Sequence, residues 1–483
     1  MRPEKGTEES MQCMLFSVPA GKRRTGKEHI QRKATPGGMN MALNIVFYFS
    51  DQQRWDTMGC YGQKLPVTPC LDALAGEGTL FEQAFTCQPV CGPARACLQS
   101  GMYATETGCH INGVALPEHT DTLARRLGRA GYETAYIGKW HLASDPEHDY
   151  TTSAVPERRR GGYQYWMASD TLEFTSHGYN GYVFDSSMQR HDFVGHRIDC
   201  INAYAVDYLH RYAQGNREKP FFLFVSQLDP HHQNDHGRYE GPDGSRKRFA
   251  DYEVPPDLAG TGGDWRDNYP DYLGQCHLLD ANVGRLMDTL ESTGLKENTV
   301  FLYASDHGSH FRTRNSEYKR CCEDSCLHVP LIAWGGPFMG RGRVKELVSL
   351  MDVPATVLDL AGQEIPEAFQ GRSLARLVQG LEPDWPASVF AQISEAETGR
   401  CVRTADYKYS VTAPVFRESD VFSDVYVEDK LYDLTRDPAE RVNLVRSPEY
   451  AQVRAQMRSL LLAHMQKAHE PPCRILEPGE VKA

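Results

Sequence analysis

The stretch QPVCGPARACLQSG, residues 88–101, brings a thiol, a proline and an arginine to the start of an expected helix. Pro93 suits the first turn of a helix, so the Cys91 thiol is expected near the free N–H groups of that turn. Those N–H groups and the Arg95 guanidinium would bind an anion beside whatever nucleophile stands at position 91. On these residues alone, Cys91 could be a redox thiol, a metal ligand, half of a disulfide, a buried small residue or the precursor of another group.

Two pairs of polar residues form a candidate metal site. Asp51-Gln52 and Asp306-His307 each follow an apolar run directly. Two carboxylates and an amide oxygen are ligands that suit a hard divalent cation such as Ca²⁺ or Mg²⁺. The histidine nitrogen leaves Mn²⁺ and Zn²⁺ open as alternatives. A single aspartate after a strand would more simply cap the next helix, but two such pairs with a histidine favour a metal.

Three further segments carry candidate acids and anion-binding groups. Lys139 and His141 flank Trp140, and residues i and i+2 of an extended segment face the same side. A lysine supplies a fixed positive charge for an anion, and a histidine can donate a proton to a leaving group. His231 is a second candidate acid, and Lys319 is a second candidate cation. For each of these residues a structural or solvent-exposed role is the alternative.

Four apolar runs precede these groups: NIVFYFS (44–50), ETAYIG (133–138), FFLFVSQ (221–227) and TVFLYAS (299–305). Continuous apolar strands are typical of a parallel sheet that is buried on both faces. Helical patterns lie between them, as at 120–131 and 276–294, and this alternation predicts a doubly wound α/β fold. Ligands of such folds bind beyond the carboxyl ends of the strands. The polar groups that follow the runs are therefore expected to converge on one rim.

The chain divides by composition into three parts. Residues 1–40 are polar and basic, and we expect a disordered or mis-started extension. Residues 41–375 are expected to form the catalytic α/β domain, with long insertions over the rim at 145–200 and 233–270. Residues 376–483 alternate in hydrophobicity and end in a helical pattern, which predicts a smaller C-terminal α+β subdomain with antiparallel strands.

The composition excludes some classes of partner. The 483 residues carry a formal net charge of −12, whereas a general nucleic-acid binder needs a basic face. The sequence has no apolar run of about 18 residues, which predicts no membrane span, and its N-terminus does not match a secretory signal. We therefore expect a cytoplasmic protein. Its 14 cysteines include no CxxC pair and are expected to be scattered, reduced thiols.

Two longer motifs resemble the signatures of the sulfatase family. CGPAR, followed by Leu98 and Gly101, is similar to C-x-P-x-R-x-x-L-x-x-G, and GYETAYIGKWH (131–141) resembles the second signature over its whole length. DPHH, SDHG, the Lys319 that precedes VPLI, and LYDLTRDPAERVNL also resemble sulfatase landmarks. The resemblance covers roughly residues 42–450. Two long motifs in the expected order are poorly explained by chance.

The resemblance implies an alkaline phosphatase-like fold and a hydrolase of sulfate esters. Sulfatases convert the signature cysteine, here Cys91, to formylglycine (3-oxoalanine), so the thiol would be a precursor and a maturation enzyme would be a partner. One hydroxyl of the hydrated aldehyde attacks the sulfate sulfur and releases the alcohol, and the other then expels sulfate. Arg95 would orient the modified residue. Lys139 and Lys319 would neutralise charge on the transferring group.

The remaining site residues are assigned from the same resemblance. The cation, normally Ca²⁺ with Mg²⁺ or Mn²⁺ as alternatives, would be held by the four residues at the strand ends: Asp51, Gln52, Asp306 and His307. His141 and His231 would orient the geminal diol and protonate the leaving oxygen. Asn112 and His310 are expected to bind the substrate.

The metal pairs depart from the common sulfatase pattern. Many sulfatases have Asp-Asp and Asp-Asn where this chain has Asp51-Gln52 and Asp306-His307, and Gly92 replaces the usual Ser or Thr. The Asp-Gln and Asp-His pairing looks more like that of phosphonate monoester and phosphodiester hydrolases. We predict hydrolysis of a sulfate monoester, on a carbohydrate rather than a simple aryl ester. A phosphonate or phosphodiester hydrolase and an unmodified anion-binding protein are the alternatives.

Overall fold

The computed structural model describes residues 42–215 and 218–480, which belong to the unit Met41–Ala483. The predicted extension at residues 1–40 lies outside the described residues. Within the described part of the chain, no helix is both long enough and apolar enough to cross a membrane.

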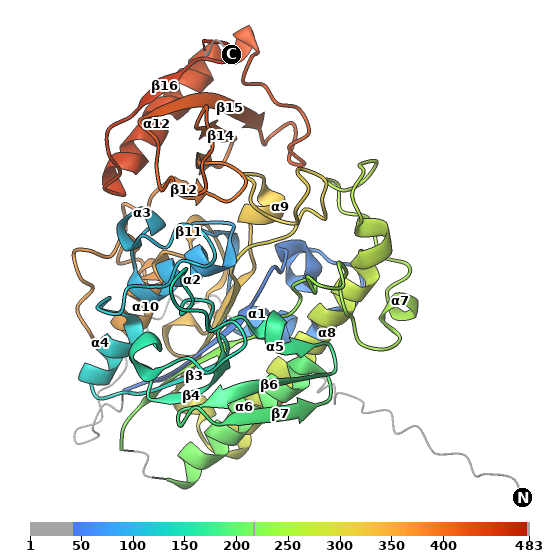
Figure 1. The fold of residues 1–483 in the computed structure, drawn as a ribbon, viewed down its shortest axis with the longest axis vertical. Helices are drawn as coiled ribbons and strands as arrows, with labels where there is room; N and C mark the ends of the chain where they lie inside the picture. Colours follow the sequence, from blue (N-terminus) through green and yellow to red (C-terminus); the bar gives the residue numbers. More distant parts are fainter. Residues whose placement is uncertain (1–41, 216–217, 481–483) are drawn as a thin grey trace, which may run out of the picture. The chain divides into compact units, whose positions relative to one another are not determined.

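A large, mainly parallel β-sheet runs through this unit (Figure 1). Over the described residues it has 11 strands in the order β11-β2-β10-β9-β1-β8-β3-β4-β6-β5, with β7 paired to β6. The strands are β1 (Asn44–Ser50), β2 (Thr79–Phe85), β3 (Glu133–Lys139), β4 (Tyr165–Ser169), β5 (Ser176–His177), β6 (Asn180–Asp185), β7 (Arg190–Val194), β8 (Phe221–Ser226), β9 (Thr299–Ser305), β10 (Leu331–Trp334) and β11 (Gly342–Ser349). The run from β9 through β1, β8 and β3 to β4 is parallel, whereas β10 and the β5–β7 edge are antiparallel. The predicted doubly wound α/β fold is confirmed.

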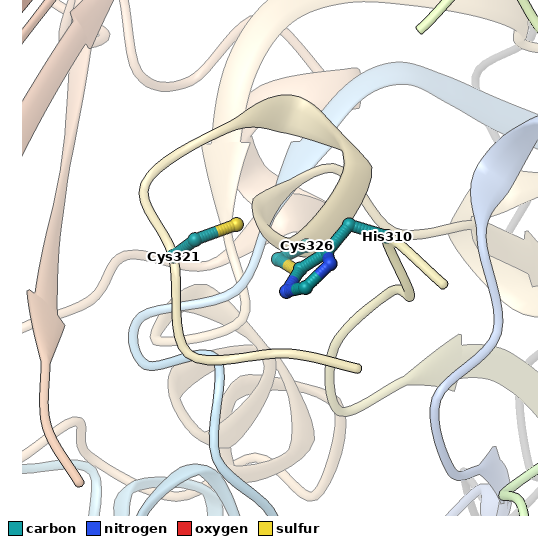
Figure 2. A group of neighbouring side chains, drawn as sticks. All are labelled: His310, Cys321 and Cys326. Atoms are coloured by element: carbon teal, nitrogen blue, oxygen red, sulfur yellow. The ribbon is translucent and has the colours of Figure 1, made fainter. Parts of the chain in front are cut away.

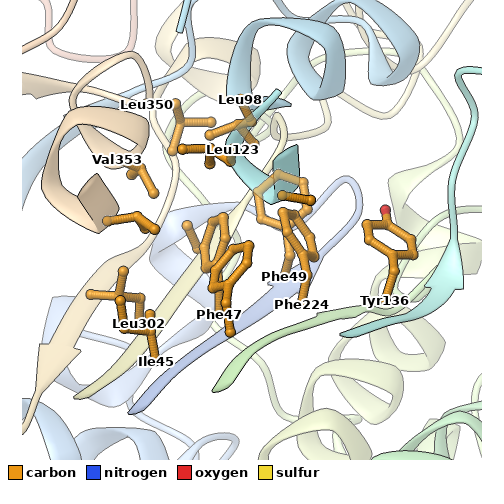
Figure 3. Packing of buried hydrophobic residues seen from close by; sticks show 14 of the residues in the cluster. Ile45, Phe47, Phe49, Leu98, Leu123, Tyr136, Phe224, Leu302, Leu350 and Val353 are labelled. Carbon is orange, nitrogen blue, oxygen red and sulfur yellow. The ribbon is translucent and has the colours of Figure 1, made fainter. Parts of the chain in front are cut away.

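Both faces of the central strands are buried, which explains their continuous apolar sequences. In β1, Phe47 and Phe49 face one hydrophobic cluster, while Val46 and Tyr48 face another. Figure 3 shows the first cluster, in which the two β1 rings lie against Phe224 of β8 at centroid distances of 4.8 and 5.6 Å. A strand of this kind cannot alternate polar and apolar residues, because no side of it meets water.

Helices cover the two faces of the sheet. The α-helices are α1 (Pro69–Glu77), α2 (Cys91–Ser100), α3 (Ala104–Thr107), α4 (Leu123–Arg129), α5 (Leu172–Thr175), α6 (Arg197–Gln214), α7 (Ser245–Arg248), α8 (Trp265–Ser292), α9 (Asp324–Leu327), α10 (Asp352–Leu360), α11 (Leu374–Val378) and α12 (Ala451–Lys467). α1, α6 and α8 pack on the Val46 face, and α6 and α8 lie side by side (Figure 1). α2, α4, α10 and α11 pack on the Phe47 face.

Two helices show how local sequence sets the helix boundaries. α4 begins after Thr122, whose hydroxyl accepts a hydrogen bond from the Arg125 N–H at 3.3 Å, as N-cap residues do. α8 begins at Trp265, well before the start that the pattern at 276–294 predicts. Pro270 lies inside the helix and interrupts the helical pattern there, because proline lacks the N–H that the helix uses.

The segment 145–200 is more regular than the sequence predicts. It holds β4, the short strands β5, β6 and β7, and the start of α6. Several residues of β6 and β7 are exposed, so these edge strands lack the continuous apolar run that identifies a central strand.

A second, smaller sheet follows the large one in sequence. Over the described residues it has five strands in the order β12-β13-β14-β15-β16. They are β12 (Ser388–Ile393), β13 (Gly399–Thr404), β14 (Tyr407–Thr412), β15 (Val425–Asp433) and β16 (Arg474–Leu476). β12 to β15 are antiparallel, and α12 lies alongside β13 and β14 (Figure 1). The predicted C-terminal α+β character is confirmed, while the boundary at residue 376 stays a prediction.

Candidate active site

The carboxyl ends of the central parallel strands bring charged side chains together at one edge of the large sheet. Asp51 follows β1, Asp306 follows β9, Lys139 ends β3 and Ser226 ends β8. Lys139 Nζ lies 2.9 Å from Asp51 Oδ2, and Arg95 of α2 donates to Ser226 Oγ at 2.6 Å. Because neighbouring parallel strands end at the same edge, residues that are far apart in sequence become direct neighbours.

Cys91 is the first residue of α2 and is fully buried at the centre of this group. Its Sγ lies 2.7 Å from Lys319 Nζ, 3.2 Å from His307 Nε2 and 3.4 Å from Asp51 Oδ1. Burial and the negative charge of Asp51 raise the pKa of the Cys91 thiol to about 12. The thiol is therefore protonated at neutral pH, and an unmodified Cys91 is a poor nucleophile.

Arg95 joins the two carboxylates of the site. Its NH2 lies 2.9 Å from Asp51 Oδ2 and 3.3 Å from Asp306 Oδ2, and its NH1 donates to the Lys139 carbonyl at 3.1 Å. The guanidinium also lies over the ring of Phe49, 5.3 Å from its centroid. An arginine fixed on so many sides holds the two carboxylates in one geometry.

Burial and charge act together on the two carboxylates. Burial alone would raise the pKa of Asp51, but Lys139, His231 and Arg95 hold that pKa well below its usual value. Burial and the charge of Asp51 raise the pKa of Asp306 to about 7. A cation placed between the two carboxylates would lower the pKa of Asp306 and relieve this repulsion.

His307 presents a lone pair to the same place. Its Nδ1 lies 2.9 Å from the Gly308 carbonyl and must donate to it, so Nε2 carries no proton in the neutral ring. That Nε2 lies 3.7 Å from Asp51 Oδ1 and 3.6 Å from Asp306 Oδ1. Ligand atoms of Asp51, Cys91, Asp306 and His307 all lie within 4.8 Å of one another. Two carboxylate oxygens and an imidazole nitrogen that lie this close together, with only backbone N–H groups and the Cys91 thiol as donors beside them, suit a divalent cation.

Gln52 is held beside this group by other contacts. Its backbone N–H donates to Asp306 Oδ1 at 2.9 Å, and its side-chain Nε2 donates to the Tyr239 hydroxyl at 2.7 Å. Its Oε1 lies 3.4 Å from His232 Nδ1. Gln52 has a φ of 67°, an uncommon backbone conformation for a residue other than glycine. The structure thus places Gln52 in the cluster, and its role as a cation ligand stays a prediction.

Lys319 and His231 form a hydrogen-bonded pair beside Cys91. His231 Nδ1 lies 2.6 Å from the His232 carbonyl and donates to it, so its Nε2 accepts from Lys319 Nζ at 3.2 Å. Burial and the charge of Lys319 hold the pKa of His231 well below its usual value. His231 is therefore neutral, with a free acceptor nitrogen directed at the lysine ammonium.

His141 lies at the entrance to this cluster and borders a cleft of about 290 Å³. It has a φ of 60°, and its Nδ1 is buried without a hydrogen-bond partner among the described residues. Burial and the charge of Lys139 lower the pKa of His141 to about 3. The cleft is lined by Asn112, Gly113, His141, Ser144, Thr151, Asp170, Thr171, Glu173, Phe174 and Asn234.

Asn112 fixes the first turn of α2. Its Oδ1 accepts from the Gly92 N–H at 2.9 Å, and a Cβ at position 92 would lie 3.0 Å from that oxygen. Glu395, in the turn between β12 and β13, accepts from the backbone and side chain of Asn112 and lies 2.5 Å from Arg320. The close approach of Asn112 favours glycine at position 92, where many sulfatases have Ser or Thr.

His310 lies in the same segment as Lys319 but makes different contacts. Its ring is fully buried, and Nε2 lies 3.1 Å from the Lys319 carbonyl, to which it donates. The ring also lies beside the thiols of Cys321 and Cys326. Its predicted role in substrate binding stays a prediction.

Two acidic residues near the site were missed in the sequence. Glu173 Oε2 lies 2.9 Å from Lys139 Nζ. Asp170 accepts from the backbone N–H groups of Leu142, Ala143 and Ser144, which follow His141. Asp170 comes directly after β4 and Glu173 lies in the short helix α5 that follows, so the rule of polar residues after a strand would have pointed to Asp170. The signal was hidden because β4 was not recognised as a strand.

Comparison with known proteins identifies the family of this chain and several relatives. A family model described as Sulfatase matches residues 43–363, and one described as N-sulphoglucosamine sulphohydrolase, C-terminal, matches residues 317–467. The chain is 30% identical over 468 residues to the uncharacterized sulfatase YidJ of Escherichia coli (strain K12), covering 89% of this chain and 88% of that protein. It is 25% identical over 501 residues to an N-acetylglucosamine-6-O-sulfatase of Bacteroides thetaiotaomicron, covering 86% and 85% of the two chains.

A solved structure shows the same likeness in three dimensions. The crystal structure of yidJ from Bacteroides fragilis matches this chain with a TM-score of 0.76 at 25% identity. The match covers 89% of this chain and 97% of the other.

Proposed function

The chain belongs to the sulfatase family, and we propose that it cleaves a sulfate monoester on a carbohydrate with a nucleophile formed from Cys91. The chain is an enzyme with the alkaline phosphatase-like fold of that family. The observation that carries the proposal is the position of Cys91: a buried lysine, a neutral histidine and a carboxylate all converge on its side chain.

The raised pKa of Cys91 supports modification of this residue. A protonated thiol cannot attack sulfate at a useful rate, yet Lys319, His307 and Asp51 all contact this side chain. Conversion to formylglycine by a maturation enzyme would supply a geminal diol, one hydroxyl of which displaces the alcohol from sulfur while the other expels sulfate. Arg95 and the N-terminal turn of α2 would hold the anionic groups at this position.

The cation implied by the family fits the cluster described above. Asp51 Oδ1 and Asp306 Oδ1 lie 3.7 and 3.6 Å from the His307 Nε2 lone pair, and Gln52 is the adjacent amide. We propose that these four residues hold Ca²⁺, with Mg²⁺ or Mn²⁺ as alternatives, which would supply positive charge to the sulfate oxygens. Lys139 and Lys319 would add positive charge at the same place without a metal.

We propose that His231 and His141 take part in proton transfer. The acceptor Nε2 of His231 contacts the Lys319 ammonium, which in turn contacts position 91. Lys319 and His231 can therefore accept a proton from a hydroxyl at position 91 and return it. His141 lines the cleft, and the N–H of its neutral ring would be the group that hydrogen-bonds a leaving alcohol there.

A carbohydrate substrate is supported by the cleft and by a relative. The cleft is lined mainly by polar side chains, and Phe174, with 52% of its surface exposed, offers an aromatic face of the kind on which sugar rings stack. The relative in Bacteroides thetaiotaomicron is named for its action on N-acetylglucosamine sulfate. We do not expect nucleic acid or a membrane as partners, and the cytoplasmic location stays a prediction.

Turnover of matched substrates tests this function. Protein made with a maturation enzyme would be given sulfated monosaccharides, a 4-nitrophenyl sulfate and a bis-4-nitrophenyl phosphate, each with Ca²⁺. We expect kcat/KM to be highest for one of the sulfated sugars. Preferential cleavage of the phosphodiester would assign the chain to the alternative hydrolase class, and tight sulfate binding without turnover of any compound would identify an anion-binding protein.

A further inference from the structure

The segment between β9 and α9 carries much of the candidate active site without regular secondary structure. It begins with Asp306 and His307, reaches Lys319, and contains no helix or strand before Asp324. Within this segment, Phe311 and Arg312 have positive φ values of 51° and 59°. Each ordered residue loses conformational entropy. A segment without helix or strand hydrogen bonds therefore needs other contacts to hold it in one conformation.

Three side chains of this segment and the following helix meet in one place. His310, Cys321 and Cys326 are all buried, at 0%, 3% and 0% exposure, and ligand atoms of all three lie within 4.8 Å of one another. Figure 2 shows Cys321 approaching from the loop, Cys326 from α9, and the His310 ring beside Cys326. The cluster thus joins the beginning and the end of the segment that bears Lys319.

These residue types favour a soft or borderline divalent cation. Thiolate and imidazole ligands select zinc and similar ions, whereas Ca²⁺ and Mg²⁺ prefer oxygen. Two thiolates would also balance the charge of a divalent ion, so the buried site would carry little net charge. The candidate calcium cluster around Asp51 has a different donor set, with two carboxylates, one histidine and a single thiol.

The ring of His310 has a lone pair available for such an ion. Nε2 donates to the Lys319 carbonyl at 3.1 Å, and the only contact at Nδ1 given by the described residues is a long one, 3.4 Å, from the Arg314 N–H. The same imidazole therefore touches the backbone of Lys319. Fixing this ring would fix the carbonyl of the lysine that contacts Cys91.

A carboxylate stands close to the cluster as a candidate for the fourth ligand. Glu323 is 1% exposed, and its charge acts on Cys321. Its Oε1 accepts from the Tyr432 hydroxyl at 2.9 Å, while its Oε2 is buried without a hydrogen-bond partner among the described residues. Structural zinc sites are nearly always four-coordinate. Glu323, whose carboxylate interacts with Cys321 and whose Oε1 also lies 3.4 Å from Lys430 Nζ, is a candidate for the fourth position.

We propose that His310, Cys321 and Cys326 bind a zinc-class cation that fixes the Lys319 segment, with Glu323 as a candidate fourth ligand. The ion has a structural role in this proposal and takes no part in the hydrolysis of the sulfate ester. The cysteine spacing C-x4-C differs from that of common zinc modules, so a metal site here could not be predicted from motif spacing. The fold brings His310, the third ligand, next to the two cysteines.

Cobalt substitution tests the site with a readout that is independent of activity. Full-length protein with a Cys91→Ala replacement would be purified under reducing conditions, stripped of metal and titrated with Co²⁺. The replacement removes the thiol of the other cluster, so thiolate-to-cobalt charge-transfer absorption would report on Cys321 and Cys326. We expect that absorption at about one Co²⁺ per chain and its displacement by Zn²⁺. In the same background, Cys321→Ser and Cys326→Ser should each weaken binding at least about 100-fold, since even outer-shell changes cost about 10- to 100-fold.

Cys322→Ser is the matched control, because Cys322 is a buried neighbour outside the cluster. It should bind Co²⁺ like the parent. Absence of the charge-transfer band in the parent, or equal loss in Cys322→Ser, would overturn the proposal. A Cys321–Cys326 disulfide in protein purified without reductant, seen as a mass lower by a pair of hydrogens, would overturn it too. If the serine variants do not fold, the native mass of the parent grown with zinc decides, since the proposal requires one bound zinc.

Discussion

The pair between Glu173 and Lys139 allows a quantitative prediction. Lys139 Nζ lies 2.9 Å from a carboxylate oxygen of Asp51 and 2.9 Å from one of Glu173. Burial would raise the pKa of Glu173, but the charge of Lys139 holds it at about 2, against an ordinary value of 4.5. That difference corresponds to about 3 kcal/mol of interaction with the charged form. Lys139 keeps Asp51 when Glu173 is neutralised, so we expect Glu173→Gln to lower the free energy of unfolding by about 1–3 kcal/mol.

The effect on catalysis should be larger on kcat than on KM. Glu173 acts through Lys139, as a positioning residue, and Lys139 is expected to act on charge that develops in the transition state. We predict a fall in kcat of about 10- to 100-fold with KM changed by less than about threefold. The assays are urea denaturation and steady-state kinetics on the preferred sulfate ester. Glu118→Gln is the control, because Glu118 is itself exposed where it pairs with Arg158 and Arg159, and ion pairs at the surface are worth about 0–1 kcal/mol.

The pH dependence of unfolding tests the same variant in a second way. A carboxylate with a lowered pKa in the folded state contributes stability above its ordinary pKa, and this contribution is lost as the pH falls toward the folded value. The stability difference between the wild type and Glu173→Gln should therefore shrink below pH 4.5 and vanish near pH 2. Equal unfolding energies at neutral pH together with an unchanged kcat would refute the role given to Glu173.

Three further changes test other parts of the site. Cys91→Ala should abolish turnover while near-ultraviolet circular dichroism and the unfolding midpoint stay close to wild type; retained activity would contradict the role of position 91. Lys319→Met should lower kcat by at least about 100-fold in steady-state assays, because it removes a buried charge beside the nucleophile, and a change in KM alone would count against this role. Burial holds the pKa of His328 at about 3, so the unfolded chain binds a proton that the folded chain does not as the pH falls below 6.5. In urea titrations, His328→Gln should lose about 1–3 kcal/mol less stability than wild type between pH 6.5 and 4; parallel curves would show that His328 does not control acid stability.

The central strands could be predicted from the sequence because burial on both faces leaves an unmistakable pattern. β1, β3, β8 and β9 are continuous apolar runs, and each is followed by the polar residues that form the site. The edge strands β5 to β7 escaped prediction because part of each faces water and because their pairing depends on tertiary contacts. The first turns of α8 could not be predicted either, because Pro270 interrupts the helical sequence pattern there.

The residues that meet at the strand ends were named from the sequence, but their pairing was not. Glu173 and Glu395 lie in segments without a motif, and only the fold brings them to Lys139 and Asn112. The cluster around His310 is a second example. It combines residues whose spacing matches no common metal motif. The irregular segment after β9 folds so that His310 lies beside Cys321 and Cys326.

The mass of the peptide that contains residue 91 tests the central claim most directly. The chain would be expressed with and without a formylglycine-generating enzyme, and the tryptic peptide that ends at Arg95 would be weighed and compared with the specific activity of the same sample. The account predicts the mass change of thiol-to-aldehyde conversion, with turnover of the sulfate ester rising in proportion to the converted fraction. Full turnover by protein in which Cys91 remains an unmodified thiol would contradict it.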